Sequence, residues 1–326
     1  MGVTLVWRTD VHLSDRSPQS RTDDWRETIL GKLRQIGEIA KEVKAEAVID
    51  GGDFFDLKSP SRNSHSLVRA VADLHAEYPC PVYANIGNHD CIYGDYSYLD
   101  QQPLGVLYST GVFRRLYDEY EAVFGSPGTK LRPRVRVVGI PYHGTKYDMD
   151  RFKNIKKGDE DYLVVAAHVL ASPKGGQMFE NEDIVKYADL AGLDPDVWLF
   201  GHWHKDQGIT EIAPGKQVVN LGSLSRGALI QDDLDRKPAC VVLSFEASGV
   251  SIERRDLNVL PAAEVFDLDG RVRTEARTAA MDFFVESIKE TLASNTQTSL
   301  LDIIRGLPDI PEEVREQAIL YLEQAQ

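Results

Sequence analysis

Side chains that bind metals gather in five short clusters, and each cluster directly follows an apolar run typical of a β-strand. The clusters are Asp10-Val11-His12, Gly51-Gly52-Asp53-Phe54-Phe55-Asp56, Gly87-Asn88-His89-Asp90, His168 and Gly201-His202-Trp203-His204. In open α/β sheets, ligands bind beyond the carboxyl ends of the strands, where such side chains converge. We therefore expect the five clusters to meet at one site.

Each cluster taken alone is a weak signal. A lone Asp-x-His on a loop is usually part of a turn or of the surface, and Asn88 alone is more often a turn former. His168 alone is more often a buried structural histidine. Five of the eight histidines fall in the clusters, and this coincidence favours a metal site over five unrelated turns.

The types of ligand indicate which metals the site would bind. Carboxylates, an amide oxygen and imidazoles without thiolates suit Mn²⁺, Fe or Zn²⁺. Two ions about 3.5 to 4 Å apart would share a carboxylate, and such a pair activates water and holds phosphate oxygens during in-line displacement. A protonatable histidine beside them could stabilise the transition state or protonate the leaving oxygen. We expect two divalent ions, Mn²⁺ first, with Mg²⁺, Fe or Zn²⁺ as alternatives.

The clusters need a scaffold of strands and helices to position them. Strand and helix patterns alternate early in the chain, with strands expected over 3–9, 47–50 and 81–86 and helices over 23–44 and 64–78. Further strands are expected over 135–140, 162–167, 197–200, 208–212, 217–220, 239–245 and 250–254. This order predicts an α/β fold of two packed sheets flanked by helices, a four-layer α-β-β-α sandwich.

Composition narrows the class of protein. The 326 residues are 42% hydrophobic and 27% charged, as in ordinary globular proteins. We see no apolar run near the roughly 18 to 20 residues that span a membrane, and the first residues do not resemble a signal peptide. Cys80, Cys91 and Cys240 lie far apart, so a disulfide framework is not expected. A cytoplasmic protein without membrane association fits best.

The net charge of −14 argues against a simple nucleic-acid binder, which normally carries a basic surplus. It does not exclude a protein that captures phosphates through bound cations. From residue 257 onward there are 13 acidic and 6 basic residues, a balance of −7 and thus half of the net charge.

The same C-terminal part has a helical pattern. An amphipathic helix is expected over 277–292, a polar linker over 294–299, a helix over 300–307, and another beginning at Pro311. Such a pair of short helices is too small to bury a core alone. It would either dock on its own domain or bind a helix of a partner.

The motifs D-x-H, G-D-x-x-D, G-N-H-D, a lone His and G-H-x-H, in this order, resemble the calcineurin-like metallophosphoesterase superfamily over residues 3–256. The ligands that the resemblance implies for one metal are Asp10, His12 and His204, those for the other metal are Asn88, His168 and His202, and Asp53 would bridge both. His89 matches the catalytic histidine that acts on the phosphate and the leaving group. Asp90 matches a carboxylate that orients His89, which would fix the tautomer of its imidazole.

Within the superfamily the chain looks most like the SbcD-type DNA double-strand-break repair nucleases and their short phage relatives. The loop from Gly52 through Asp56, followed by Ser59-Pro60-Ser61, carries this likeness. The resemblance implies a nuclease domain over 1–256, a reduced capping region over 257–293, and a linker and helical hairpin over 294–326. That hairpin would bind a coiled-coil ATPase of SbcC type, and the complex would act on DNA in repair and recombination in a bacterial or phage-infected cell. The resemblance leaves open whether a homodimer forms.

Two departures from the nuclease pattern are visible. Archaeal and eukaryotic relatives carry a histidine, linked to exonuclease action, where this chain has Asp56. Aspartate there occurs in bacterial and phage members but is also the general superfamily residue, so Asp56 does not separate exonuclease from endonuclease activity. The capping region is short, which weakens the case for DNA recognition through it.

Other functions fit parts of the pattern. A small-molecule phosphodiesterase of the cyclic-nucleotide type would need the same metal site, and only the tail and the loop argue against it. A scaffold that has lost catalysis would have lost ligands, yet all are present. Lys130, Arg132, Arg134 and Arg136 alternate on a strand and could follow a DNA backbone or form a solvated edge. Lys58 and Arg62 flank the second cluster and could reach a phosphate.

Overall fold

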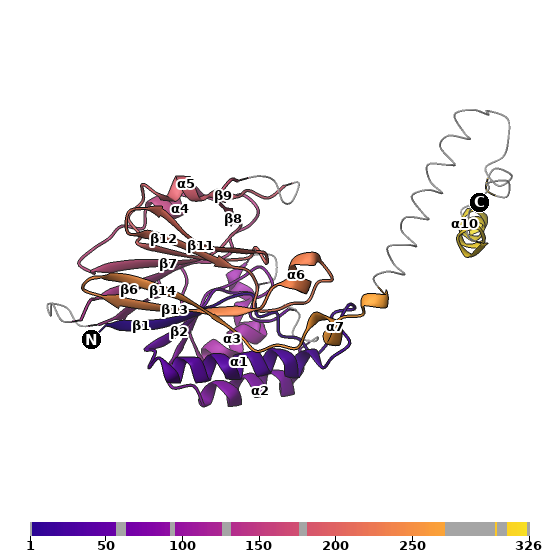
Figure 1. The fold of residues 1–326 in the computed structure, drawn as a ribbon, viewed down its shortest axis with the longest axis horizontal. Coiled ribbons are helices and arrows are strands. Elements are labelled where there is room, and N and C mark those ends of the chain that lie inside the picture. The colour runs from indigo at the N-terminus through magenta and orange to yellow at the C-terminus, as the bar shows by residue number, and fades with distance from the viewer. Residues whose placement is uncertain are drawn as a thin grey trace, which may run out of the picture. The chain divides into compact units, whose positions relative to one another are not determined.

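The computed structural model describes residues 2–56, 63–91, 95–125, 132–175, 181–270, 304 and 312–324 of the chain. The chain divides into two compact units, Met1–Val265 and Phe266–Gln326. All the predicted site residues lie in the first unit, which is built from two six-stranded sheets and the helices that cover them (Figure 1).

The first sheet has the strand order β14-β13-β1-β2-β3-β4. Its strands are β1 Val3–Arg8, β2 Ala47–Asp50, β3 Val82–Ala84, β4 Phe113–Arg115, β13 Ala239–Glu246 and β14 Gly249–Asp256. Strands β1 to β4 are mutually parallel, and β13 pairs antiparallel with β1. The carboxyl ends of β1, β2 and β3 therefore lie at one edge of this sheet, where the first three clusters begin.

The second sheet has the order β11-β12-β10-β7-β6-β5. Its strands are β5 Glu121–Phe124, β6 Val135–Ile140, β7 Tyr162–His168, β10 Val197–Gly201, β11 Asp206–Ala213 and β12 Lys216–Leu221. The neighbours β6, β7, β10 and β12 are parallel, whereas β5 and β11 run antiparallel at the two edges. Because β7 and β10 are adjacent and parallel, His168 and the run that starts at Gly201 leave the sheet side by side.

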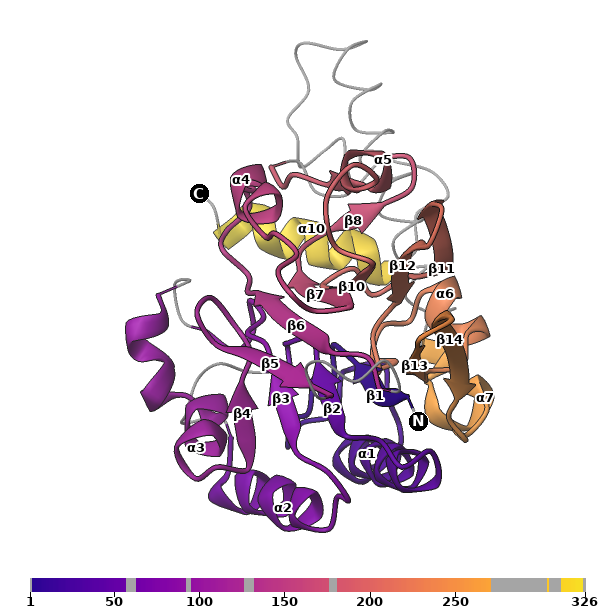
Figure 2. The ribbon, with the colours of Figure 1, turned by 90° about the vertical axis from the view of Figure 1, so that its left-hand side faces the viewer.

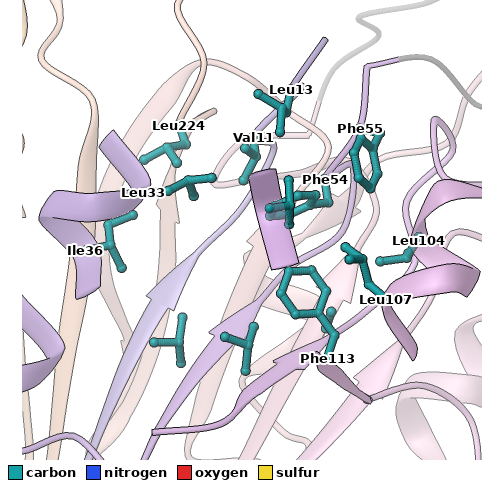
Figure 3. Close-up of a cluster of buried hydrophobic side chains, with 14 of the residues drawn as sticks. Val11, Leu13, Leu33, Ile36, Phe54, Phe55, Leu104, Leu107, Phe113 and Leu224 are labelled. Carbon is teal, nitrogen blue, oxygen red and sulfur yellow. The ribbon is translucent and has the colours of Figure 1, made fainter. Parts of the chain in front are cut away.

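Three apolar clusters fill the spaces between the layers. The one between the sheets contains Trp7, Ile49 and Val164, together with the other inward-facing side chains of both sheets. A second cluster lies between the first sheet and α1 Trp25–Glu42, α2 His65–Ala76 and α3 Pro103–Ser109 (Figures 2 and 3). The third lies between the second sheet and α4 Met149–Lys153 and α5 Tyr187–Leu190. The predicted four-layer α-β-β-α sandwich is thus confirmed.

The remaining described elements of the first unit are short. They are the 3₁₀-helix η3 Tyr96–Gln101, the two-residue strands β8 Ala171–Ser172 and β9 Val185–Lys186, and the helices α6 Gln231–Asp235 and α7 Ala262–Val265. β8 and β9 pair with each other just after His168, and α6 follows the loop that leaves β12.

The helix α1 forms where its sequence directs it. The side chain of Asp24 accepts a hydrogen bond from the Glu27 amide and caps the first turn, as N-cap aspartates commonly do. Leu33, Ile36 and Ala40 recur at helical spacing and are buried against the first sheet. The expected helix over 23–44 is confirmed, shortened at both ends to its capped core.

In the second unit, the helix expected to begin at Pro311 is present as α10 Glu312–Gln324. Val314 of this helix is buried. The helix expected over 277–292 and the linker over 294–299 lie outside the described residues, as does all of the helix expected over 300–307 except the helical residue Ile304. Among the described helices, none is both long enough and apolar enough to cross a membrane.

Candidate metal centre

The loops after β1 and β2 are joined by backbone hydrogen bonds. The amide of Asp10 donates to the Gly52 carbonyl at 3.1 Å, and the amide of His12 donates to the Asp53 carbonyl at 3.0 Å. Phe54 and Phe55, in the loop after β2, are buried in the cluster between the first sheet and its helices, together with Phe113 (Figure 3). The aromatic pair anchors the second loop, so that the carboxylate of Asp53 is held at the edge of the sheet.

The backbone of the site is strained. In the described residues, six non-glycine residues have positive φ, and four of them are predicted ligands: Asp10 at 53°, His12 at 47°, Asp53 at 53° and His202 at 84°. Such conformations cost of order 1 to 3 kcal/mol each and persist where the surrounding structure requires them, often at functional sites. Gly52 has φ 100°, and a Cβ there would lie 2.6 Å from the Gly87 nitrogen. The loops can approach this closely only with glycine at Gly52.

Asp53 lies between two imidazoles. Its Oδ2 is 3.6 Å from Nε2 of His12 and 3.3 Å from Nε2 of His168. Two atoms bonded to one ion at about 2.1 Å are separated by roughly 3.0 Å at a bond angle of about 90° and roughly 3.6 Å at about 120°. A single carboxylate oxygen at these separations from both nitrogens fits a ligand shared by two cations.

The first set of ligand atoms comes from Asp10, His12, Asp53 and His204, which each offer one atom within 4.8 Å of the others. Asp10 Oδ1 lies 3.6 Å from Nε2 of His204 and 3.9 Å from Nε2 of His12. The two imidazole Nε2 atoms are 3.0 Å apart. Two nitrogens and two carboxylates that converge in this way match the four predicted ligands of one ion.

The second set comes from Asp53, His168 and His202, whose ligand atoms also lie within 4.8 Å of one another. The side-chain oxygen of Asn88 lies 3.3 Å from Nε2 of His168 and completes the predicted set. The structure therefore brings all seven predicted ligand residues into two adjacent groups that share Asp53. Hard oxygen and imidazole donors without thiolates suit divalent cations such as Mn²⁺, Mg²⁺, Fe or Zn²⁺, so the residues fit the expected ions.

Without bound cations, the buried carboxylates raise the pKa values of two neighbouring imidazoles. Burial lowers the pKa of His12, but its hydrogen bonds with Asp10 and Asp56 and the charge of Asp53 outweigh burial and raise that pKa to about 10. Burial likewise lowers the pKa of His168, and the charge of Asp53 raises it to about 9. Each imidazole pairs with a negative charge that a metal ion would otherwise neutralise.

His89 stands at the rim of the site. Its ring is 4.8 Å from that of His12, and its side chain is 41% exposed. The His89 amide donates to Asp53 Oδ1 at 2.7 Å, while the ring Nδ1 lies 2.6 Å from the carbonyl oxygen of Asp56. The structure thus places His89 beside the shared carboxylate, with one ring nitrogen held by the backbone.

The expectation that Asp90 orients the His89 imidazole is wrong. In the described part of the chain, the Asp90 carboxylate makes no hydrogen bond to that ring and instead accepts from four backbone amides, those of Asp53, Phe54, Phe55 and Gly87. Burial and the charge of Asp53 raise the pKa of Asp90 to about 7, against the effect of the hydrogen bond from the Gly87 amide. The chain turns sharply at the Gly-Asn-His-Asp motif, so consecutive side chains point to different partners.

A match over most of the first unit decides the family. The sequence model described as calcineurin-like phosphoesterase matches residues 5–206, which include every predicted ligand and His89. The chain belongs to the calcineurin-like metallophosphoesterase family. No curated protein sequence matches the chain.

Solved structures resemble this metallophosphoesterase in fold. A dimetal phosphatase from Danio rerio is 13% identical, with a TM-score of 0.51, over 78% of this chain and 96% of that one. A purple acid phosphatase from yellow lupin is 14% identical, with a TM-score of 0.43, over 78% of this chain and 51% of that one. At such low identity, the likeness to the Danio rerio protein shows the shared fold and leaves the substrate open.

One residue of the metallophosphoesterase site was not predicted from the sequence. Glu182 lies in the loop before β9, and its Oε1 is 2.9 Å from Nε2 of His202. Burial raises the pKa of Glu182, but the hydrogen bonds from His202 and Tyr147 outweigh burial and hold that pKa below its usual value. Glu182 belongs to none of the five clusters and follows no strand, so no pattern in the sequence marks it.

Proposed function

We propose that the protein is a two-metal phosphodiesterase that cleaves DNA as the nuclease subunit of an SbcCD-type repair and recombination complex. The observation that carries the phosphodiesterase part is the position of Asp53 Oδ2 between Nε2 of His12 and Nε2 of His168. Two divalent cations held by these side chains, Mn²⁺ in our proposal, would supply charge for the phosphate oxygens and an activated water.

His89 is the proposed group for proton transfer. A carbonyl oxygen can only accept a hydrogen bond, so the 2.6 Å contact with Asp56 requires the proton on His89 Nδ1. Nε2 is then the nitrogen that remains for the substrate, on a side chain that is 41% exposed. In the proposed reaction, a His89 ring that carries protons on both nitrogens stabilises the charged transition state or gives its Nε2 proton to the leaving oxygen, and Nε2 then regains a proton from solvent.

The rim of the site supports a polymeric substrate. His204 and Asp56 have side chains that are 46% and 42% exposed, while Asp10 and Asp53 behind them are buried. From this open side, a phosphodiester within a strand could reach the cations that the buried carboxylates would hold, without being enclosed. The SbcD-like loop is the sequence feature that supports DNA over a small diester, and the part of it over 57–62, with Lys58 and Arg62, lies outside the described residues.

The basic residues expected along one strand do not favour DNA binding there. Arg132 pairs with Glu46 at 2.5 Å, Arg134 pairs with Asp159, and Arg136 pairs with Glu160 at 2.8 Å. These ion pairs occupy the three arginines. The expected solvated edge is not what the structure has, because β6 lies between β5 and β7 and only Arg136 belongs to it. Lys130 lies outside the described residues. With a net charge of −14, the isolated chain is expected to bind DNA weakly, and the proposed ATPase partner would supply basic surface.

The test is a substrate comparison with the purified full chain and Mn²⁺. Linear duplex DNA, single-stranded DNA, a cyclic nucleotide and a small chromogenic phosphodiester are offered at matched concentration, with and without the SbcC-type ATPase. We expect cleavage of DNA that the ATPase increases, and hydrolysis of the chromogenic diester. Turnover confined to the cyclic nucleotide would replace the nuclease assignment with the small-molecule phosphodiesterase.

A further inference from the structure

The Glu182 side chain lies against His202 and is itself nearly buried. Its Oε1 is 2.9 Å from Nε2 of His202 and also accepts the hydroxyl of Tyr147 at 2.7 Å. The exposed fractions of the Glu182 and His202 side chains are 9% and 11%. The contact is thus shielded from solvent, where a charge-assisted hydrogen bond is stronger than on an open surface.

The loop that carries Glu182 is held in place by its neighbours. The amide of Asp183 donates to the Thr145 carbonyl at 2.9 Å. The Asp183 carboxylate accepts from Lys146 Nζ at 2.8 Å and from the Tyr147 amide at 3.1 Å. The Tyr147 hydroxyl in turn accepts from the Leu170 amide at 2.9 Å, two residues beyond His168. Glu182 is therefore fixed relative to the strand end that provides a metal ligand.

The contact determines which nitrogen of His202 can bind a cation. A carboxylate accepts a hydrogen bond, so Nε2 carries the proton and Nδ1 keeps its lone pair. We propose that Glu182 is a positioning residue of the metal centre. It holds Nε2–H of His202 so that Nδ1 faces the cation that Asp53 and His168 would also bind. Metal-binding histidines commonly donate their other ring N–H to a carboxylate or a carbonyl in this way.

The other buried imidazoles of the centre have the same arrangement. His12 presents Nε2 to Asp53, and its Nδ1 lies 3.4 Å from Asp56 Oδ1. His168 also presents Nε2 to Asp53, and its Nδ1 lies 2.8 Å from the Gly51 carbonyl oxygen. Glu182 gives His202 the partner that Asp56 and Gly51 give to the other two. The inference rests on metal binding at this site, which the proposed function shares, and not on DNA as the substrate.

The test compares three variants of the full chain. Glu182→Ala removes the acceptor. We expect the affinity for Mn²⁺ at the group that contains His202 to fall 10- to 100-fold. The ion at the group that contains His12 and His204 should bind as in the wild type. Glu182→Gln keeps an acceptor oxygen at the same position and should stay closer to the wild type than to Glu182→Ala. Asp189→Asn is the matched control, because it removes one acidic charge at an exposed position of α5, and it should bind both ions normally.

Binding is measured by calorimetric titration of Mn²⁺ into chelator-treated protein, and thermal unfolding of the metal-free variants reports on the fold. Wild-type affinity for both ions in Glu182→Ala would overturn the inference. Equal losses in Glu182→Gln and Glu182→Ala would also overturn it, since the charge rather than the hydrogen bond would then matter. An equal loss of affinity for both ions in Glu182→Ala, together with a lower unfolding temperature, would overturn it as well. Failure to cleave DNA would contradict only the proposed nuclease function.

Discussion

The carboxylate of Asp90 accepts a hydrogen bond of 2.7 Å from the backbone amide of Asp53. Through this contact and those to Phe54, Phe55 and Gly87, a buried carboxyl group ties the loop after β2 to the loop after β3. Because Asp53 is the shared carboxylate of the metal centre, the position of its backbone depends directly on Asp90. The role of Asp90 in the Gly-Asn-His-Asp motif is thus to hold loops together.

Asp90→Asn is expected to destabilise the protein. The asparagine retains one oxygen acceptor, and its amide group would face backbone N–H groups that need an acceptor. A buried donor left without a partner costs about 1 to 3 kcal/mol, so the free energy of unfolding should fall by about that amount in urea denaturation. Asp73→Asn, on the exposed face of α2, is the matched control. Unchanged stability with loss of turnover would assign Asp90 to the chemistry instead.

His89→Ala is expected to separate catalysis from metal binding. The His89 ring belongs to neither of the two ligand groups that share Asp53, so two Mn²⁺ should still bind by calorimetry. Turnover of a chromogenic phosphodiester should fall about 10²- to 10⁴-fold, the usual contribution of a positioned acid or base. His65→Ala changes an exposed histidine at the start of α2 and should leave turnover unchanged. Wild-type turnover in His89→Ala would remove His89 from the mechanism.

Central strands could be predicted closely from the sequence, and so could the long edge strands β11 and β14, expected over 208–212 and 250–254. The two short edge strands could not. The expected strands over 47–50 and 135–140 coincide with β2 and β6, because continuous apolar runs mark strands buried on both faces. The short strands β4 and β5 were not predicted. They lie at the outer edges of the two sheets and have three and four residues, too few for a period to emerge.

The convergence of ligands could be predicted for a similar reason. Parallel strands place their carboxyl ends together, so the residues after β1, β2 and β3 had to meet at one edge, and those after β7 and β10 at another. The packing of the two sheets then brings both edges to one site. The partners of those residues could not be predicted. Whether Asp90 faces His89 or the amide of Asp53 depends on the backbone path of a tight turn, and Glu182 reaches His202 only through contacts of a separate loop.

Proton release should accompany metal binding. In the folded protein without metal, the pKa values of His12 and His168 are raised to about 10 and about 9, and a metal ligand must be neutral. At pH 8, above the raised pKa of Asp90 of about 7, loading both sites should therefore release about two protons per chain. Calorimetry in buffers of different ionisation enthalpy measures this number. Release near zero would contradict the charged state of the two imidazoles.

The same pKa values give the sign of the pH effect on stability. Both are above the value of about 6.5 expected for an unfolded histidine, so the folded state binds more protons than the unfolded state between that pH and 9 to 10. Stability from these groups is complete below about pH 6.5 and is lost as the pH rises through 9 to 10. The unfolding temperature of chelator-treated protein should fall over this range, while its affinity for Mn²⁺ should rise because protons compete less. Parallel changes in the two quantities would contradict this linkage.

Removal of residues 299–326 should separate catalysis from partner binding. The truncation removes α10 and leaves the unit Met1–Val265, which contains every predicted ligand. Hydrolysis of a chromogenic phosphodiester should therefore be unchanged, while co-purification with the proposed SbcC-type ATPase should be lost.

A single substitution on α10 tests the same surface without a deletion. Leu320 is 47% exposed on this helix, and an exposed leucine is a ready contact for a partner helix. Leu320→Asp should weaken ATPase binding, because a carboxylate buried in an apolar interface loses its hydration. Leu260→Asp changes a leucine that is 53% exposed in the other unit and serves as the matched control. If the truncated chain still binds the ATPase, or if both point variants weaken binding equally, the partner does not dock on α10 and the tail has another role.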